Sequence, residues 1–193
     1  MAQLLLKYSR IEIQMAIQLL TLASDWETKP VTQDNVLAFL KWFATNTDSL
    51  MLKKAVKQIK AVKVGPLPSN PSALMGIDLR SHTLYVTERM QWGENSLERV
   101  TSSSELRHEL GHVIWQSLRT KPAAQAFVKA VLEESKKGKY ISSYQETMGK
   151  RFYAKKVSQD IFAHEAFAEW VKFGPAHDRG CPKQHMEFRK LFK

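Results

Sequence analysis

The sequence predicts a mixed α+β fold that is mainly helical, with a small antiparallel sheet and a helical N-terminal extension. Three observations support this prediction. Apolar residues recur at helical intervals in the first third of the chain, a proline-rich stretch then interrupts them, and two short alternating segments precede further helical stretches. The chain has 193 residues, of which 44% are hydrophobic and 25% charged, so it can bury a core without cross-links.

The N-terminal third is predicted to be entirely helical. The strongest break in the chain follows it, because residues 65–71 contain Pro66, Pro68 and Pro71. We therefore expect a helical extension over residues 1–64 and a second domain over residues 65–193. Apolar positions at helical spacing predict helices in the extension over residues 3–23, 35–44 and 50–62.

The second domain is predicted to begin with a β-hairpin, formed by strands at residues 74–78 and 83–87. The next helix is expected to start at Ser102, because Glu105 three residues later completes a reciprocal capping arrangement. Residues 139–157 show no clear pattern. Further helices are predicted over residues 122–137, 158–173 and 183–192.

Cysteine content and hydropathy bear on localisation. Cys181 is the only cysteine, so no internal disulfide can form, and we expect a reducing, cytoplasmic setting with Cys181 as an unremarkable loop or surface thiol. Lys7, Arg10 and Glu12 interrupt the apolar N-terminus, which does not favour a signal peptide. No stretch reaches the ~18 consecutive apolar residues of a spanning helix, so no membrane partner is expected.

The chain is strongly basic, with a net charge of +10. Such charge favours phosphate-rich or acidic partners, so nucleic acid is a possible partner. The alternative is a solvated helix face, because Val56, Ile59 and Val62 alternate with the lysines at nearly helical spacing. The lysines that crowd this segment are Lys53, Lys54, Lys57, Lys60 and Lys63.

An HExxH pattern begins at His108 and ends at His112, on a predicted helix. Residues four apart share one helix face, so both imidazoles can reach a single ion at the zinc–nitrogen distance of about 2.0 to 2.1 Å. Glu109 lies one position round the helix, where its carboxylate can contact a metal-bound water, and it is the expected general base. The alternative is a pair of ordinary surface or core histidines on an amphipathic helix.

A catalytic zinc site needs a third protein ligand and keeps a fourth position open. Trp115 and Leu118 stand where a longer motif, HExxHxxGxxH, would place its glycine and its third histidine. A glutamate elsewhere in the chain must then supply the ligand.

The helix predicted over residues 158–173 carries Glu165 and Glu169 on one face. Carboxylates on the inner face of such an apolar helix are unfavourable without partners. We assign Glu165 to the metal, and Glu169 to the role of accepting the free N–H of a ligand histidine. His164 is a rival ligand that points about 100° away round the helix, and two exposed glutamates on an ordinary helix are the alternative.

With these motifs and the tail at residues 182–192, the chain resembles the metallopeptidases of the anthrax lethal factor type, including related domains carried by bacteriophage proteins. The resemblance covers roughly residues 74–192 and includes the pattern E-x-F-A-E, which starts at Glu165. It implies a zincin-like fold of the gluzincin type, zinc (Zn2+) as cofactor and peptide-bond hydrolysis. Carried over by position, it implies His108, His112 and Glu165 as ligands. It also implies Glu109 as the base and Glu169 as a supporting carboxylate.

The same family has a tyrosine upstream of its third ligand that stabilises the transition-state oxyanion. The segment ending at Tyr144 looks like the family's Ser-x-Tyr element, so Tyr144 is assigned this role, with Tyr153 as a competitor. The strand at residues 83–86 occupies the place of the family's edge strand, which pairs with substrate backbone. A purely structural hairpin is the alternative.

These observations together predict a zinc metalloendopeptidase that acts on a protein or peptide substrate, with Glu109 as general base. A protein of a different class remains as the alternative. It is a basic, DNA-associated or phage-encoded accessory protein in which the metal only stabilises the fold.

Overall fold

The computed structural model describes residues 31–88, 90, 96–173 and 180–192, and for residues 96–102 the backbone alone. The predicted helix over residues 3–23 lies outside this described part. The helices are α2 (Gln33–Asn46), α3 (Leu50–Val56), α4 (Ser96–Leu118), α5 (Pro122–Ser135), α6 (Ser143–Tyr153), α7 (Gln159–Phe173) and α8 (Pro182–Lys190), and the strands are β1 (Ala61–Val64), β2 (Met75–Asp78) and β3 (Thr83–Val86).

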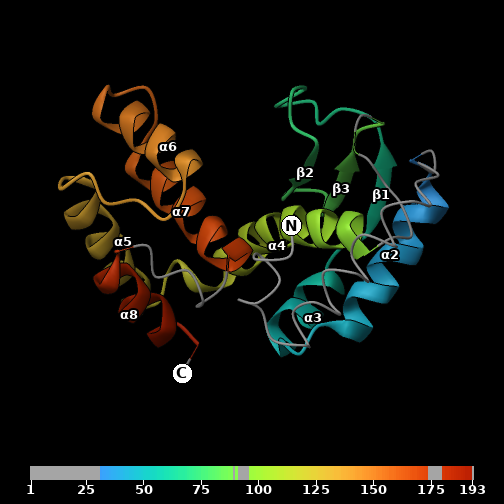
Figure 1. Ribbon diagram of the computed structural model, residues 1–193, viewed down its shortest axis with the longest axis horizontal. Coiled ribbons are helices and arrows are strands. Elements are labelled where there is room, and N and C mark those ends of the chain that lie inside the picture. The colour runs from blue at the N-terminus through green and yellow to red at the C-terminus, as the bar shows by residue number, and fades with distance from the viewer. Residues whose placement is uncertain (1–30, 89, 91–95, 174–179, 193) are drawn as a thin grey trace, which may run out of the picture.

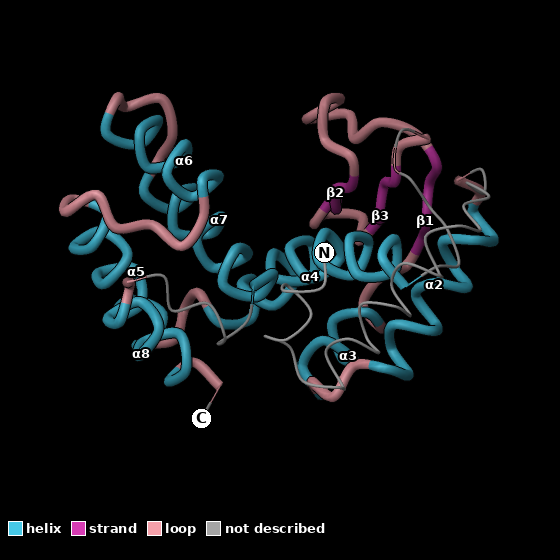
Figure 2. Tube along the Cα trace, in the orientation of Figure 1, coloured by secondary structure: helices cyan, strands magenta, loops and turns pink. Residues whose placement is uncertain are grey.

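The arrangement is mainly helical with one small sheet, which confirms the α+β class (Figure 2). Figure 1 shows α4 across the middle of the molecule, with the sheet, α2 and α3 at one end and α5 to α8 at the other. None of the helices in the described part is long and apolar enough to cross a membrane. Of the two settings expected for Cys181, loop or surface, the surface is wrong: Cys181 immediately precedes α8 outside the helix, but its side chain is buried.

The sheet is mixed, and the prediction of an antiparallel sheet is wrong. The predicted hairpin of β2 and β3 is present, but β1 joins it parallel to β3, in the order β1-β3-β2. The helix predicted over residues 50–62 therefore ends at Val56, and Val62 pairs with Leu84 instead. Through β1, residues before position 65 share a sheet with residues after it.

The position of β3 corrects a second prediction. The strand at residues 83–86 was expected at the edge of the sheet, yet β3 lies between the other two strands and is hydrogen-bonded on both sides. In the described part of the chain β2 forms the edge that faces α4. The expectation failed because it rested on a two-stranded hairpin, and the third strand comes from the segment predicted as helix.

Helix α4 begins at Ser96, so the prediction that Ser102 caps its start is wrong. Glu105 lies inside the helix, and its carboxylate accepts a hydrogen bond from Lys172 Nζ on α7 at 2.7 Å. This ion pair joins α4 to α7, which form the most extensive contact between any two described elements.

The hydrophobic core follows the crossing of α4 and α7 and continues onto α5 and α8. Trp115 of α4 packs against Phe167 of α7 with ring centroids 5.0 Å apart, and Phe127 of α5 and Phe188 of α8 close around Phe167. Trp115, Phe127, Phe167 and Trp170 are almost completely buried. Aromatic burial on this scale holds the two long helices in a fixed relation, and the candidate site depends on that relation.

Candidate metal centre

The candidate site lies where α4 crosses α7. Gly111, in the middle of the HExxH segment, has no side chain and lies directly against Ala168 of α7. This close approach brings the histidines of α4 next to the glutamates of α7. The local sequence determines the spacing of the histidines on α4 and of the glutamates on α7. The crossing of the two helices determines the distance between the histidines and the glutamates.

Three potential metal-binding atoms converge there. The Nε2 atoms of His108 and His112 are 3.1 Å apart, and the Glu165 Oε2 atom is 3.4 Å from the first and 3.7 Å from the second. Tetrahedral zinc with bonds of about 2.0 to 2.1 Å requires ligand atoms roughly 3.3 to 3.4 Å apart. The three measured distances bracket that value, so the donor set fits a zinc ion.

Glu169 lies behind His108, on the side of the ring away from the other two donor atoms. Its Oε1 atom is 2.9 Å from His108 Nδ1, and the side chain is only 2% exposed. With Nδ1–H donated to Glu169, the lone pair that Nε2 has once it is deprotonated is directed toward His112 and Glu165. Burial alone would lower the pKa of His108, but the hydrogen bonds to Glu165 and Glu169 outweigh it and raise that pKa.

His112 and Glu165 have pKa values that leave both ready to donate electron pairs. Burial lowers the pKa of the His112 imidazole to about 3, so this ring is neutral. The pKa of Glu165 is also lowered, because the neighbouring histidines, His108 first, outweigh the opposing effect of burial. A neutral imidazole and an ionised carboxylate are the forms that bind a metal ion.

Glu109 lies beside these atoms but has its own anchor. One of its carboxylate oxygens, Oε2, accepts a hydrogen bond from the backbone N–H of Ile77 in β2 at 2.9 Å. Metal-binding atoms of Glu109, His108 and His112 lie within 4.8 Å of one another. Burial raises the pKa of Glu109 to about 7. This carboxyl group is therefore poised to take up and release a proton near neutral pH.

Two tyrosines were candidates for the oxyanion role, and only Tyr144 lies at the site. The Tyr144 hydroxyl, on the first turn of α6, donates a hydrogen bond to Glu165 Oε2 at 3.2 Å. Partial burial and then the negative charge of Glu165 raise the Tyr144 pKa, so the hydroxyl keeps its proton. The Tyr153 hydroxyl lies 2.8 Å from that of Ser135, at the other end of α6.

His164, the rival ligand, lies outside the donor set. Its Nε2 atom is 3.4 Å from the backbone oxygen of His112, and its ring packs edge-on against the His112 ring, with centroids 4.4 Å apart. His164 therefore borders His112 rather than sharing an ion with it and Glu165.

The site opens into a cavity of about 510 Å³. Its lining includes the edge strand β2 with the preceding loop, where Leu74 is half-exposed, and Tyr144 of α6. The ion pair of Glu105 and Lys172 lines it as well. Neither the Ile77 amide nor this ion pair has a signal in the sequence, because a backbone donor and a contact between helices leave no local pattern.

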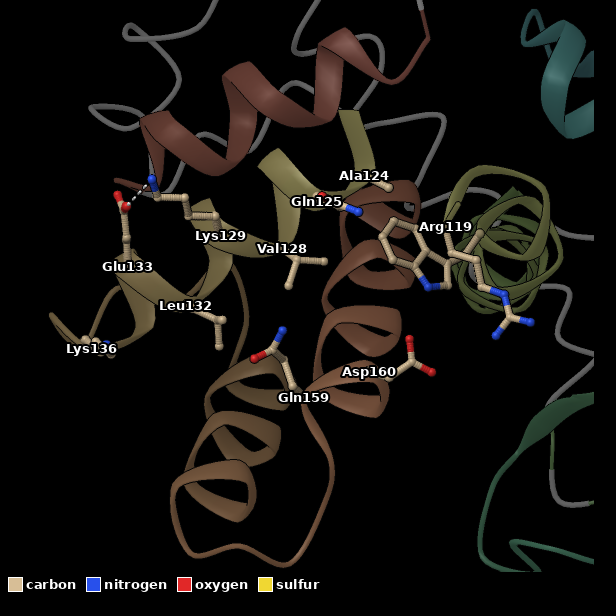
Figure 3. A pocket seen from close by; sticks show the side chains of 11 residues that line it. Arg119, Ala124, Gln125, Val128, Lys129, Leu132, Glu133, Lys136, Gln159 and Asp160 are labelled. Atoms are coloured by element: carbon tan, nitrogen blue, oxygen red, sulfur yellow. Dashed lines mark ion pairs between the residues drawn. The ribbon is translucent and has the colours of Figure 1, made fainter. Parts of the chain in front are cut away.

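A second cavity of about 620 Å³ lies among α5 and the adjoining ends of α4 and α7 (Figure 3). Its carboxylates belong to Glu133 and Asp160, and its lining has no histidine or cysteine. Glu133 is paired with Lys183 at 2.8 Å and with Lys129 at 4.0 Å. This cavity therefore lacks the donors of a zinc site, and the smaller cavity is the functional candidate.

Comparison with models of known protein families, with curated proteins and with solved structures found no match to this chain.

Proposed function

We propose that the protein is a zinc-dependent peptidase. The observation that carries this proposal is the convergence of the His108, His112 and Glu165 donor atoms at 3.1 to 3.7 Å, with the Glu109 carboxylate beside them. Two imidazoles and a carboxylate form a donor set suited to zinc. When bound, zinc supplies Lewis acidity, which lowers the pKa of water and polarises a carbonyl group.

The residues around this donor set suit hydrolysis. Glu109, with a pKa near 7, can accept a proton from the attacking water and return it to the leaving amine. Tyr144 keeps its hydroxyl proton and can donate it in a hydrogen bond to the oxyanion that develops on the scissile carbonyl. Glu169 holds the His108 ring in place through both steps.

The open cavity favours an enzyme over the accessory protein with a structural metal. Structural zinc sites are closed by four protein ligands, whereas three donors border a cavity of about 510 Å³ here. In the described part of the chain β2 is an edge strand and lines that cavity, and an edge strand can pair with an extended peptide through backbone groups other than the Ile77 amide, which Glu109 engages. We therefore propose polypeptide as the substrate, bound along β2 rather than along β3.

Replacing Glu109 tests the proposal. Glu109→Gln keeps the size of the side chain but removes the proton acceptor, so we expect cleavage of a complex peptide mixture, followed by mass spectrometry, to fall about 10²- to 10⁴-fold. Zinc content, measured by elemental analysis, is expected to stay near one equivalent. Glu146→Gln, on the exposed face of α6 and paired with Lys150, is the matched control and is expected to cleave normally.

Two outcomes would count against a peptidase. One is zinc-loaded wild-type protein that cleaves no peptide bond in the mixture. The other is a Glu109→Gln variant as active as the Glu146→Gln control, because the proposed proton transfer depends on this carboxylate.

A further inference from the structure

A group of lysines lies away from the cavity, around the end of α3 and along β1. We call it the lysine cluster. No acidic residue occurs in the sequence between Asp48 and Asp78, so nothing within this segment offsets its positive charge. The members of the cluster are Lys53, Lys54, Lys57, Lys60 and Lys63.

The fold exposes four of these side chains, at Lys54, Lys57, Lys60 and Lys63, and leaves Lys53 partly buried. Leu52 and Ala55 of α3 are buried, which leaves Lys54 and Lys57, three positions apart, as exposed neighbours at the end of the helix. The chain then turns, and the backbone N–H of Lys60 donates to the His82 carbonyl at 2.9 Å. This hydrogen bond fixes the turn to the hairpin, so the lysines are presented from an anchored backbone.

The positive charge of the cluster is not offset by ion pairs within the described part of the chain. Among the described residues, none of its lysines has a carboxylate partner within 4.0 Å, whereas the ion pairs on α5 to α8 engage Lys129, Lys150, Lys172, Lys183 and Lys190. Attraction to the negative C-terminal end of α3 favours Lys53 and Lys54, which lie in its last turn. Lys60 and Lys63 lie beyond the helix and gain nothing from it.

The outer face of the sheet extends the same surface. Lys63 of β1 is paired in register with Tyr85 of β3, and its ammonium group lies 5.8 Å from the centre of the tyrosine ring. Ammonium groups beside an aromatic ring suit a chain of phosphates and bases. The cluster contains lysine alone, and lysine binds phosphate as a point charge without the forked geometry with which arginine reads a base edge.

We propose that the lysine cluster is a docking surface for nucleic acid, bound through its phosphate backbone without preference for base sequence. Lys63 of the cluster lies on β1, at one edge of the sheet, whereas β2 at the opposite edge lines the cavity. A nucleic acid on this surface leaves the cavity open. The inference rests on charge and exposure and is independent of the proposed peptidase activity.

Binding of the full-length protein to a labelled duplex DNA of about 20 base pairs, followed by fluorescence anisotropy from about 50 to 200 mM salt, tests the inference. If all five lysines contact phosphates, the slope of log Kobs against log salt is roughly −4.5. The triple variant Lys54→Glu, Lys57→Glu, Lys60→Glu is expected to raise Kd at least tenfold and to make the slope shallower by roughly 3.

The matched control reverses three exposed lysines after α5, in the triple variant Lys136→Glu, Lys137→Glu, Lys139→Glu. It changes the net charge equally and is expected to bind DNA within about threefold of wild type, since it keeps every phosphate contact of the cluster. Circular dichroism checks that both proteins are folded. If the first triple variant fails to fold, the double variant Lys57→Gln, Lys60→Gln replaces it. The expected loss of DNA affinity is then smaller.

The results separate the possible outcomes. An equal loss of DNA affinity in both triple variants would mean that the overall charge of the protein attracts the DNA. This result would overturn the proposed surface. Absence of binding at low salt would overturn it too. Duplex RNA and single strands are included because they share the phosphate backbone, and their binding through the cluster supports the proposal. Binding to anionic lipid vesicles with none to any nucleic acid would contradict it.

Discussion

Gly111 of α4 and Ala168 of α7 lie so close that a Cβ atom at position 111 would be 2.7 Å from the Ala168 Cα atom. Atoms of real side chains do not approach backbone this closely, so the two helices can cross as they do only with glycine here. The crossing brings His108 and His112 to Glu165. A residue inside the HExxH segment that binds no metal therefore determines whether the donor atoms meet.

Gly111→Ala is expected to separate α4 from α7, since the added methyl group meets backbone that cannot rotate away. Overpacking of this kind typically reduces the free energy of unfolding by about 1 to 3 kcal/mol, and zinc affinity should fall with it. Thermal unfolding and competition with a chromophoric chelator measure the two effects. Gly138→Ala is the control: its φ of 70° strains alanine, yet nothing lies near its Cβ, so stability should fall while zinc affinity stays unchanged.

Glu165→Gln and Glu169→Gln should weaken zinc binding unequally. Glu165 contributes a donor atom, whereas Glu169 only orients the His108 ring. Loss of an orienting carboxylate typically weakens binding about 10- to 100-fold, and Glu165→Gln is expected to exceed that range. Chelator competition gives both constants, and equal effects would contradict the assignment of Glu165 as the ligand.

Zinc affinity should rise with pH. In the metal-free protein, Glu165 and Glu169 raise the pKa of His108, and this proton must leave before Nε2 can bind a metal ion. Below that pKa, affinity is expected to increase about tenfold per pH unit for each proton released. In Glu169→Gln the His108 pKa falls, so the rise should level off at a lower pH. A pH-independent affinity in the wild type would show that His108 does not lose a proton on binding.

Tyr144→Phe and Tyr153→Phe separate the two tyrosines. Removing the Tyr144 hydroxyl is expected to lower kcat about 10²- to 10³-fold with little change in zinc content, because it removes an oxyanion donor. Tyr153→Phe should leave kcat unchanged and reduce stability by about 1 kcal/mol, through loss of its hydrogen bond with Ser135. Steady-state kinetics and thermal unfolding report the two effects, and the reverse pattern would reassign the role to Tyr153.

Much of the site could be predicted because its residues are related by helical periodicity. The spacing of His108 and His112, and of Glu165 and Glu169, is local information, and the burial of Glu169 and partial burial of Glu165 follow from the apolar face around them. The amide of Ile77 could not be predicted, because a backbone donor has no signature in the sequence. The choice between Tyr144 and Tyr153 depends on how α6 packs, which its sequence alone does not determine.

The differences between the predicted and the observed fold have physical causes. Val56, Ile59 and Val62 are three apart and suggest one helix, yet Val62 and Val64 also alternate with Lys63 as a strand requires. Pairing with β3 decides between the two, and that is a tertiary effect. By contrast, the start of α6 has a local signal in the sequence: Ser142 is a capping residue, and its hydroxyl accepts a hydrogen bond from the backbone N–H of Gln145.

The hydrogen bond between Ile77 and Glu109 also limits the free edge of β2. One amide of that edge is already engaged by the carboxylate, so a polypeptide bound along β2 in the proposed way would pair with the backbone groups on either side of that amide. The engaged amide would then restrict the register in which such a polypeptide pairs with β2. This register would determine which peptide bond faces the histidines, before any preference among side chains applies.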